Sequence, residues 1–155
     1  MINVIYMVSI ILITVISVIY IIYQNKLIKE AIYFSQKQTR YFNLMVRWFT
    51  NKQYGNDVGQ YLFEKGYKTA AIYGMNYVGE CLLRELENSN IELKYVIDKV
   101  VIKAEEGIRV CSLMDYLEDV DVVIVTALLS YDEVCGSLKE KLDSDILSIE
   151  DILED

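Results

Sequence analysis

The residues best suited to chemistry are the run Gly74-Met75-Asn76-Tyr77-Val78-Gly79, which follows an apolar run, 70–73, and precedes a predicted helix. A strand, a glycine turn and a helix in this order direct backbone N–H groups and a helix amino terminus toward a phosphate. In the G-x-G-x-x-G fingerprint the second glycine allows close approach of a pyrophosphate, and here Asn76 holds that position. We predict a phosphate-facing turn at Gly74, Met75, Asn76 and Gly79.

Two further residues are expected beside this turn because each ends a predicted strand. Asp98 ends the second strand, where an acid bonds ribose hydroxyls, and Thr126 ends the fourth strand. NAD(P) or a nucleotide-sugar is the expected ligand, and Lys99 beside Asp98 leaves the choice between NAD and NADP open. Glu80 would place a carboxylate near the phosphate. A purely structural role for the turn is the alternative, because the turn needs glycine whether or not a nucleotide is present.

Other catalytic and metal-binding chemistry has little support in the sequence. The chain has no histidine, so imidazole ligands and imidazole bases are excluded, and the three cysteines lack metal-ligand spacing. We predict no metal site and no catalytic residue. The pair Tyr61 and Lys65 imitates a dehydrogenase proton-transfer pair, but it precedes the glycine turn instead of following it, so a helix-surface role is expected.

The remaining pattern predicts an α/β fold. Strands are expected at 69–73, 92–97, 108–111, 120–126 and 145–148, with helices at 57–65, 76–88, 113–117 and 131–141 and a short closing helix. This alternation predicts a three-layer, Rossmann-like domain with a five-stranded, mostly parallel sheet in the order 3-2-1-4-5. Serines 112, 130 and 148 each precede an acid by three positions, as in capping boxes. Tyr54-Gly55-Asn56-Asp57 is a turn cluster, so the domain is expected at 54–155.

The amino-terminal segment 1–23 has the composition of a transmembrane helix. It carries no charge, proline or glycine, and its length of about 34 Å spans a hydrocarbon core. A cleaved signal peptide or a buried soluble helix would be the alternatives, but the segment lacks a basic start and a small-residue cleavage site. Basic residues follow the span, which predicts the amino terminus outside and the rest in the cytoplasm, at the inner membrane.

Residues 24–53 are predicted to form a basic juxtamembrane helix with six basic and one acidic residue, whereas the rest of the chain is strongly acidic. The acidic domain argues against nucleic-acid partners, and the basic helix suits anionic lipids. Heptad-like spacing connects Leu27, Phe34, Tyr41, Met45 and Trp48. This stripe predicts either a parallel homodimer or a face that covers the chain's own domain or lies along the membrane surface.

The stretches IYGMNYVGECLLREL (72–86), IELKYVIDK (91–99) and GIRVCSLMDYLEDVDVVIVTAL (107–128) support a family resemblance. Residues 54–155 resemble the small Rossmann-like domains that accompany bacterial cell-surface polysaccharide enzymes, including nucleotide-sugar or CoA-binding-like domains of sugar acyltransferases and of membrane-anchored dehydratases. The resemblance implies a nucleotide-sugar site at Gly74, Met75, Asn76, Gly79 and Asp98. It also implies that the catalytic machinery lies in another domain.

The expected function is a membrane-anchored, nucleotide-binding or nucleotide-sugar-binding accessory protein that recruits or senses for envelope polysaccharide synthesis, with a synthesis enzyme as partner. Catalysis by this chain alone is not expected. Two alternatives stay open: a structural scaffold with a degenerate domain, and a ligand-gated regulatory subunit resembling potassium-channel regulatory domains.

Overall fold

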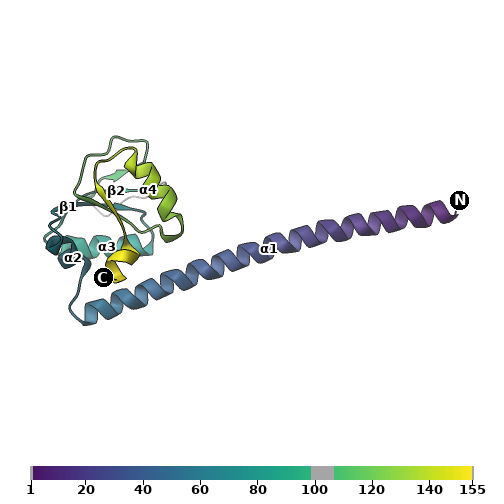
Figure 1. The fold of residues 1–155 in the computed structure, drawn as a ribbon, viewed down its shortest axis with the longest axis horizontal. Coiled ribbons are helices and arrows are strands. Elements are labelled where there is room, and N and C mark those ends of the chain that lie inside the picture. The colour runs from purple at the N-terminus through teal and green to yellow at the C-terminus, as the bar shows by residue number, and fades with distance from the viewer. Residues whose placement is uncertain (1, 99–106, 155) are drawn as a thin grey trace. The chain divides into compact units, whose positions relative to one another are not determined.

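The computed structural model describes residues 2–98 and 107–154 and shows a mixed α/β chain with one long apolar helix at its amino terminus (Figure 1). The elements in chain order are α1 (Ile2–Gln53), α2 (Val58–Glu64), β1 (Thr69–Tyr73), α3 (Tyr77–Glu87), β2 (Glu92–Ile97), β3 (Val110–Cys111), β4 (Val122–Val125), η1 (Leu128–Ser130), α4 (Tyr131–Lys139), β5 (Asp145–Ser148) and α5 (Ile149–Glu154). Lys99, beside the predicted site, lies outside the described residues.

The five strands form one parallel sheet in the order β3-β2-β1-β4-β5, which is the predicted order. In its register Tyr73 lies opposite Ile97 on one side and Val125 on the other. The carboxyl ends of β1, β2 and β4 therefore meet at one edge of the sheet. From β1, the next two strands in the chain, β2 and β3, are added on one side of β1. The last two strands, β4 and β5, are added on its other side, so the direction of the strand order changes between β1 and β4.

Alternating side chains of the strands supply two separate apolar clusters. Ala70 and Ile72 belong to a cluster that also contains Val78, Leu82 and Leu86 of α3. Ala71 and Tyr73 belong to the other, together with Val134 and Leu138 of α4. The period of two in β1 thus gives α3 and α4 different clusters to pack into. Continuous burial along β1 and β4 is typical of parallel strands covered on both faces.

One predicted helix and one predicted helix cap were wrong, although α4 (Tyr131–Lys139) begins where a helix was predicted. No helix forms at 113–117: the box at Ser112 and Asp115 is present, because the Ser112 N–H donates to Asp115 Oδ2 at 2.6 Å, but it closes only a turn. Leu117 is buried and Leu113 packs against the same apolar cluster, while Met114 and Tyr116 are 89% and 80% exposed, so apolar anchoring of two residues does not by itself make this short segment helical. Ser130 makes no side-chain cap, because η1 leads directly into α4.

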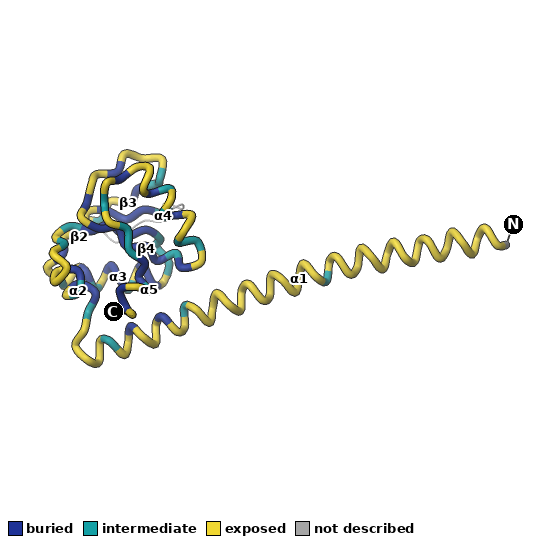
Figure 2. Tube along the Cα trace, in the orientation of Figure 1, coloured by how far each residue is buried: buried dark blue, intermediate teal, exposed yellow. Residues whose placement is uncertain are grey.

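The chain divides into two compact units, Met1–Arg40 and Tyr41–Asp155. The described side chains of the first unit are exposed apart from the half-buried Gln24, and its apolar residues up to Tyr23 form no packed core (Figure 2). Within the described part of the chain, Asn3–Gln53 is the one helix long and apolar enough to cross a membrane. A signal sequence near an amino terminus meets the same requirements of length and composition.

The second unit begins at Tyr41, earlier in the chain than the boundary expected at Tyr54, because the last turns of α1 pack into it. Leu44 and Trp48 are 1% and 5% exposed and belong to the α3 cluster. Glu85 of α3 reinforces this packing: Oε2 accepts the Trp48 indole N–H at 2.8 Å and pairs with Lys52 at 3.0 Å, and Oε1 accepts the Val58 N–H at 2.6 Å. One carboxylate therefore joins α1, α2 and α3.

The predicted heptad stripe divides between these two environments. Tyr41 and Trp48 pack against the chain's own core, in agreement with the second interpretation of the stripe. Leu27, Phe34 and Met45 are exposed in the single chain. A homodimer through the complete stripe stays a prediction.

Candidate functional site

The glycine turn is built as a close approach between β1 and α3. Gly74 has φ +98°, a conformation that L side chains rarely adopt, and a Cβ there would lie 2.8 Å from Thr126 Oγ1. A Cβ on Gly79 would lie only 2.1 Å from the carbonyl oxygen of Gly74. The third glycine of the fingerprint has the same role of close helix packing. Both glycines are therefore required by the geometry of the turn itself.

Asn76 is the N-cap of α3. Its Oδ1 accepts the N–H groups of Val78 at 2.9 Å and Gly79 at 3.2 Å, while Nδ2 donates to Tyr41 and to the carbonyl oxygen of Thr126. Asparagine at the second-glycine position thus satisfies two of the free N–H groups at the helix start.

Asp98 lies against the turn. Its Oδ2 accepts the Met75 N–H at 2.5 Å, which connects the carboxyl end of β2 to the residue after Gly74. The carboxylate is half-buried. The carboxylate accepts a hydrogen bond from the turn and lies at the sheet edge that faces the ribose in dinucleotide-binding folds.

Thr126 and Tyr41 complete the edge. The Thr126 hydroxyl donates to the carbonyl oxygens of Tyr73 at 3.1 Å and Gly74 at 2.7 Å, so it fixes the end of β1. The Tyr41 hydroxyl donates to the Thr126 carbonyl oxygen at 3.2 Å and accepts from Asn76 Nδ2 at 3.3 Å. A side chain from α1 therefore contributes to the turn.

The six residues predicted from the sequence come together at this edge: Gly74, Met75, Asn76, Gly79, Asp98 and Thr126 are connected by the hydrogen bonds just described. Among the described residues, the N–H groups of Asn76 and Tyr77 have no hydrogen-bond acceptor in the structure. These two donors precede the pair capped by Asn76, and they leave a place where an anion could be held. Tyr77 itself is 85% exposed.

Sequence reasoning missed two residues at this edge. Tyr41 is predicted only as part of the stripe that pairs two chains or covers the chain's own domain, and no local signal connects it to Thr126, 85 positions later. Tyr73 is predicted only as a strand residue, yet its buried hydroxyl has no hydrogen-bond partner in the part of the chain that the structure describes. A tyrosine at the last position of the strand before the glycine turn is a signal that could have identified it.

The other candidate chemical groups lie apart from this arrangement. Lys65 Nζ is 5.1 Å from the centre of the Tyr61 ring on α2, a cation–π geometry. The cysteines are free thiols, with Cys111 buried in the sheet. Over residues 2–98 and 107–154, no cluster of histidine, cysteine, aspartate and glutamate could hold a metal ion.

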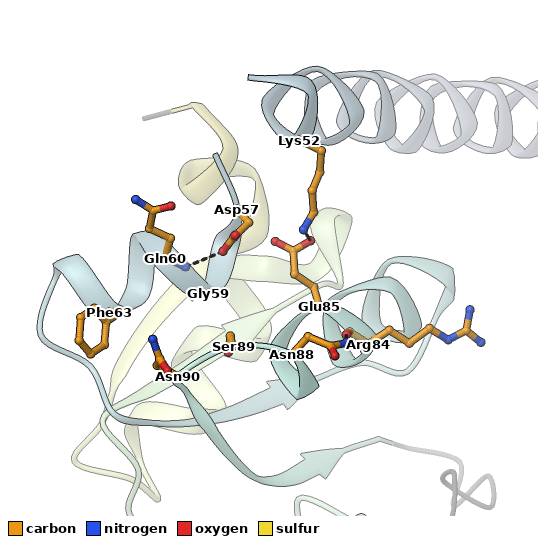
Figure 3. A pocket seen from close by; sticks show the side chains of 10 residues that line it. All are labelled: Lys52, Asp57, Gly59, Gln60, Phe63, Arg84, Glu85, Asn88, Ser89 and Asn90. Atoms are coloured by element: carbon orange, nitrogen blue, oxygen red, sulfur yellow. Dashed lines mark hydrogen bonds and ion pairs between the residues drawn. The ribbon is translucent and has the colours of Figure 1, made fainter. Parts of the chain in front are cut away.

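A polar pocket of about 480 Å³ lies beside α2 and α3, and none of the six residues predicted to bind a nucleotide lines it (Figure 3). Its walls include Gln60, Arg84, Asn88 and Asn90, and the Lys52 and Glu85 side chains point toward each other at one side. A Cβ on the lining residue Gly59 would lie 2.4 Å from Ser89 Cβ, so close packing of α2 on the end of α3 forms part of the wall.

The opposite, amino-terminal edge of the sheet carries a group of aspartates. Asp121 accepts the N–H groups of Lys68 at 2.7 Å and Thr69 at 2.8 Å, and these bonds lower the pKa of Asp121 below its usual range. Asp145 accepts the Tyr67 hydroxyl at 2.8 Å. Burial, followed by the bond and charge of Asp145, raises the pKa of Tyr67 to about 12.

Comparison of the chain with family models, curated proteins and solved structures found no match. The fold and the site define the chain only as a mixed α/β protein with a five-stranded parallel sheet, a long apolar amino-terminal helix and a glycine turn at the carboxyl edge of the sheet.

Proposed function

We propose that this chain is a membrane-anchored accessory protein whose three-layer, Rossmann-like domain binds a nucleotide or nucleotide-sugar at the carboxyl edge of the sheet. The observation that carries the proposal is the convergence of residues from three strand ends, β1, β2 and β4, on one glycine turn. In open parallel sheets, ligands bind where the direction of the strand order changes. Here that point lies between β1 and β4.

The chemistry of the turn fits the two parts of such a ligand. The N–H groups of Asn76 and Tyr77 at the start of α3 suit a phosphate. Asp98, whose Oδ2 accepts the Met75 N–H, suits hydroxyl groups of a ribose. The resemblance described above makes a role beside an envelope-polysaccharide enzyme the proposed setting.

The membrane anchor belongs to the same proposal. Residues 1–23 would span the inner membrane once, with the amino terminus outside and the domain in the cytoplasm, and the basic residues of 24–53 would face anionic lipid headgroups. A carboxyl-terminal fluorescent-protein fusion should fluoresce and fractionate with membranes after carbonate extraction. Activity of a carboxyl-terminal alkaline phosphatase fusion, which requires export, would contradict this orientation.

Thermal melting tests the binding function. The full chain in detergent micelles should gain several degrees in Tm with NADH, NADPH, CoA or a nucleotide-sugar, because ligand at 100 times its Kd stabilises by about 2.7 kcal/mol. Tyr77→Asp should abolish the shift: the side chain is 85% exposed, and a carboxylate at a helix start is tolerated but repels phosphate. Met114→Asp is the control: Met114 is also highly exposed, at 89%, but lies outside the proposed site, so this variant should keep the ligand-induced rise in Tm.

A structural scaffold is the second candidate function, and the internal hydrogen bonds favour it. Asp98 and Asn76 already satisfy three N–H groups of the turn, and the Tyr41 hydroxyl lies against Asn76. A domain that melts cooperatively, responds to none of the nucleotides and cross-links as a dimer through Phe34 or Met45 would support the scaffold and contradict the binding function.

A further inference from the structure

The last turns of α1 carry apolar side chains on two opposite faces. Leu44 and Trp48 belong to the apolar cluster that α3 also joins. On the other face Phe42, Val46 and Phe49 are exposed, the two phenylalanines at 68% and 65%. Residues three and four positions apart lie on one face of a helix, so these three form one apolar stripe, here called the outer stripe. The single chain completes its own core and leaves this face uncovered.

The spacing of the outer stripe continues toward the amino terminus of α1 as a heptad repeat. Alternating steps of four and three residues connect Phe42 to five exposed residues of the same helix: Asn25, Ile28, Ile32, Ser35 and Thr39. This repeat lies one position later than the predicted stripe, whose Tyr41 and Trp48 pack into the chain's own domain. The heptad from Asn25 to Phe49 is therefore a second seam, distinct from the predicted one.

The residue types in this seam favour two parallel strands. One of its two heptad positions, position a, holds only asparagine or β-branched residues: Asn25, Ile32, Thr39 and Val46. β-branched residues at a favour dimers, and a single asparagine there specifies the register. In a parallel, in-register pair, Ser35 and Thr39 also meet their own copies instead of an apolar side chain.

A stable pair needs more than the outer stripe. Burial of Phe42, Val46 and Phe49 alone would remove roughly 300 Å² per chain from water, compared with about 800 Å² per partner in a standard interface. At 1.5 Å per residue the outer stripe is about 11 Å long, whereas the seam from Asn25 to Phe49 is about 36 Å long. The complete repeat thus supplies about three times the length and reaches the area of a standard interface.

The charges along α1 favour a second copy of this chain over a lipid surface. Between residues 30 and 51 the positions that flank the seam are uncharged: Ala31, Gln36, Gln38, Asn43, Met45 and Thr50. Two copies of this basic helix can therefore meet there without like-charge repulsion. Beside the outer stripe, Arg47 pairs with Glu154, and Lys52 pairs with Glu85. These cations are held by the chain's own carboxylates, whereas binding to anionic lipid needs cations on the membrane side of the helix.

We propose that α1 pairs in parallel with α1 of a second copy of this chain through the heptad seam from Asn25 to Phe49. The core residue Leu44 lies on the opposite side of the helix, so each chain keeps its own core in the dimer. A common direction of the two helices agrees with the proposed membrane anchor. The inference does not depend on nucleotide binding, and a monomeric chain would leave that function untouched.

Disulfide cross-linking of the full chain in detergent micelles locates the seam. Ser35→Cys should convert most of the protein to a disulfide-linked dimer on mild oxidation, because a seam residue meets its own copy. Lys37→Cys is the matched control, since Lys37 is also exposed but lies outside the seam. Its dimer fraction should stay at the background that the three native cysteines give the wild-type chain. Phe34→Cys reports on the predicted stripe in the same way.

A charge exchange tests the parallel register. Val46→Glu and Val46→Lys, each alone, should weaken self-association at least about tenfold because like charges meet in the seam, and an equal mixture of the two should restore it. Energy transfer between fluorophore-labelled copies in micelles measures the association. Tyr54→Glu, a change at an exposed residue beyond α1, should leave it unchanged.

Three results would overturn this seam: equal cross-linking of Ser35→Cys and Lys37→Cys, stronger cross-linking of Phe34→Cys than of Ser35→Cys, or a charge mixture that associates no better than its components. A wild-type chain that stays monomeric would overturn the dimer itself. Broadening of the Phe42 resonances of that monomer by nitroxide-labelled anionic lipid would then assign the outer stripe to the membrane surface.

Discussion

The two edges of the sheet both carry acidic side chains, but they use them differently. At the amino edge, Asp121 accepts two backbone N–H groups and Asp145 accepts a tyrosine hydroxyl. At the carboxyl edge, Asp98 accepts the Met75 N–H group, while the buried Tyr73 hydroxyl has no hydrogen-bond partner among the described residues. Acids at the amino edge hold strands and loops together. The last strand residue before the glycine turn keeps one buried hydroxyl that the described part of the fold does not satisfy, which is uncommon in a folded protein.

This difference separates acids that look equivalent in the sequence. Asp98 and Asp121 each lie next to a strand, Asp98 directly after β2 and Asp121 directly before β4. Only the direction of the strands assigns them to opposite edges. In a parallel sheet, that direction identifies the acid that can meet a ligand.

The largest expected effect is at Gly79, where the carboxyl edge has no room for a side chain. Gly79→Ala should destabilise the domain by about 3 to 5 kcal/mol, because the new methyl group would meet the Gly74 backbone at 2.1 Å and α3 must shift. Thermal melting followed by near-UV circular dichroism measures this loss. Gly136→Ala on α4 has open space around it and should instead raise Tm slightly. Equal effects of the two substitutions would show that the close approach is not required.

A smaller effect is expected at Asn76. Asn76→Ala should cost about 1 to 2 kcal/mol, because the helix cap and the two bonds from Nδ2 are lost together. Asn76→Asp keeps a cap oxygen and should recover part of the loss. Thermal melts in the absence of nucleotide measure the loss of stability in both variants. An unchanged Tm in Asn76→Ala would show that the Asn76 side chain does not stabilise α3.

At the amino edge, Asp121→Ala should cost about 1 kcal/mol at pH 7, since the side chain is exposed and its two backbone bonds are partly replaced by water. The pKa of Asp121 is lowered in the folded chain, so its contribution is complete above the unfolded value of about 3.9 and is lost as the pH falls through the folded value.

Melts of the wild-type protein and Asp121→Ala from pH 7 to pH 3 check this sign. The difference in Tm should be constant at higher pH and shrink below about pH 4. A difference that grows on acidification would contradict a lowered pKa.

The smallest expected effect distinguishes the two buried tyrosines. Without nucleotide, Tyr73→Phe should leave Tm unchanged or raise it slightly, because no hydrogen bond is lost, whereas Tyr95→Phe should lower stability by about 1 kcal/mol. Equal losses in thermal melts of the two variants would show that the Tyr73 hydroxyl has a partner in the protein.

The sequence predicted the parallel sheet well because short β-rich runs alternate with helical runs, and three strands, β1, β2 and β5, have the predicted bounds. It also predicted which residues meet at the carboxyl edge, since parallel strands bring their ends together. It failed at 113–117, where the hydrogen bond of the capping box closes only a turn, although Leu113 and Leu117 pack against the core. The contributions of Tyr41 and Glu85 could not be predicted, because each depends on how α1 packs against distant parts of the chain.

The most direct test of nucleotide binding at the carboxyl edge is an NMR titration of the isotope-labelled full chain in micelles with the nucleotide that gives the largest rise in Tm. We predict chemical-shift changes at the amides of Met75, Asn76, Tyr77 and Thr126, with none at Lys68 and Thr69 of the amino edge. Changes confined to the amino edge or to the polar pocket beside α2, or no changes at all, would contradict the account.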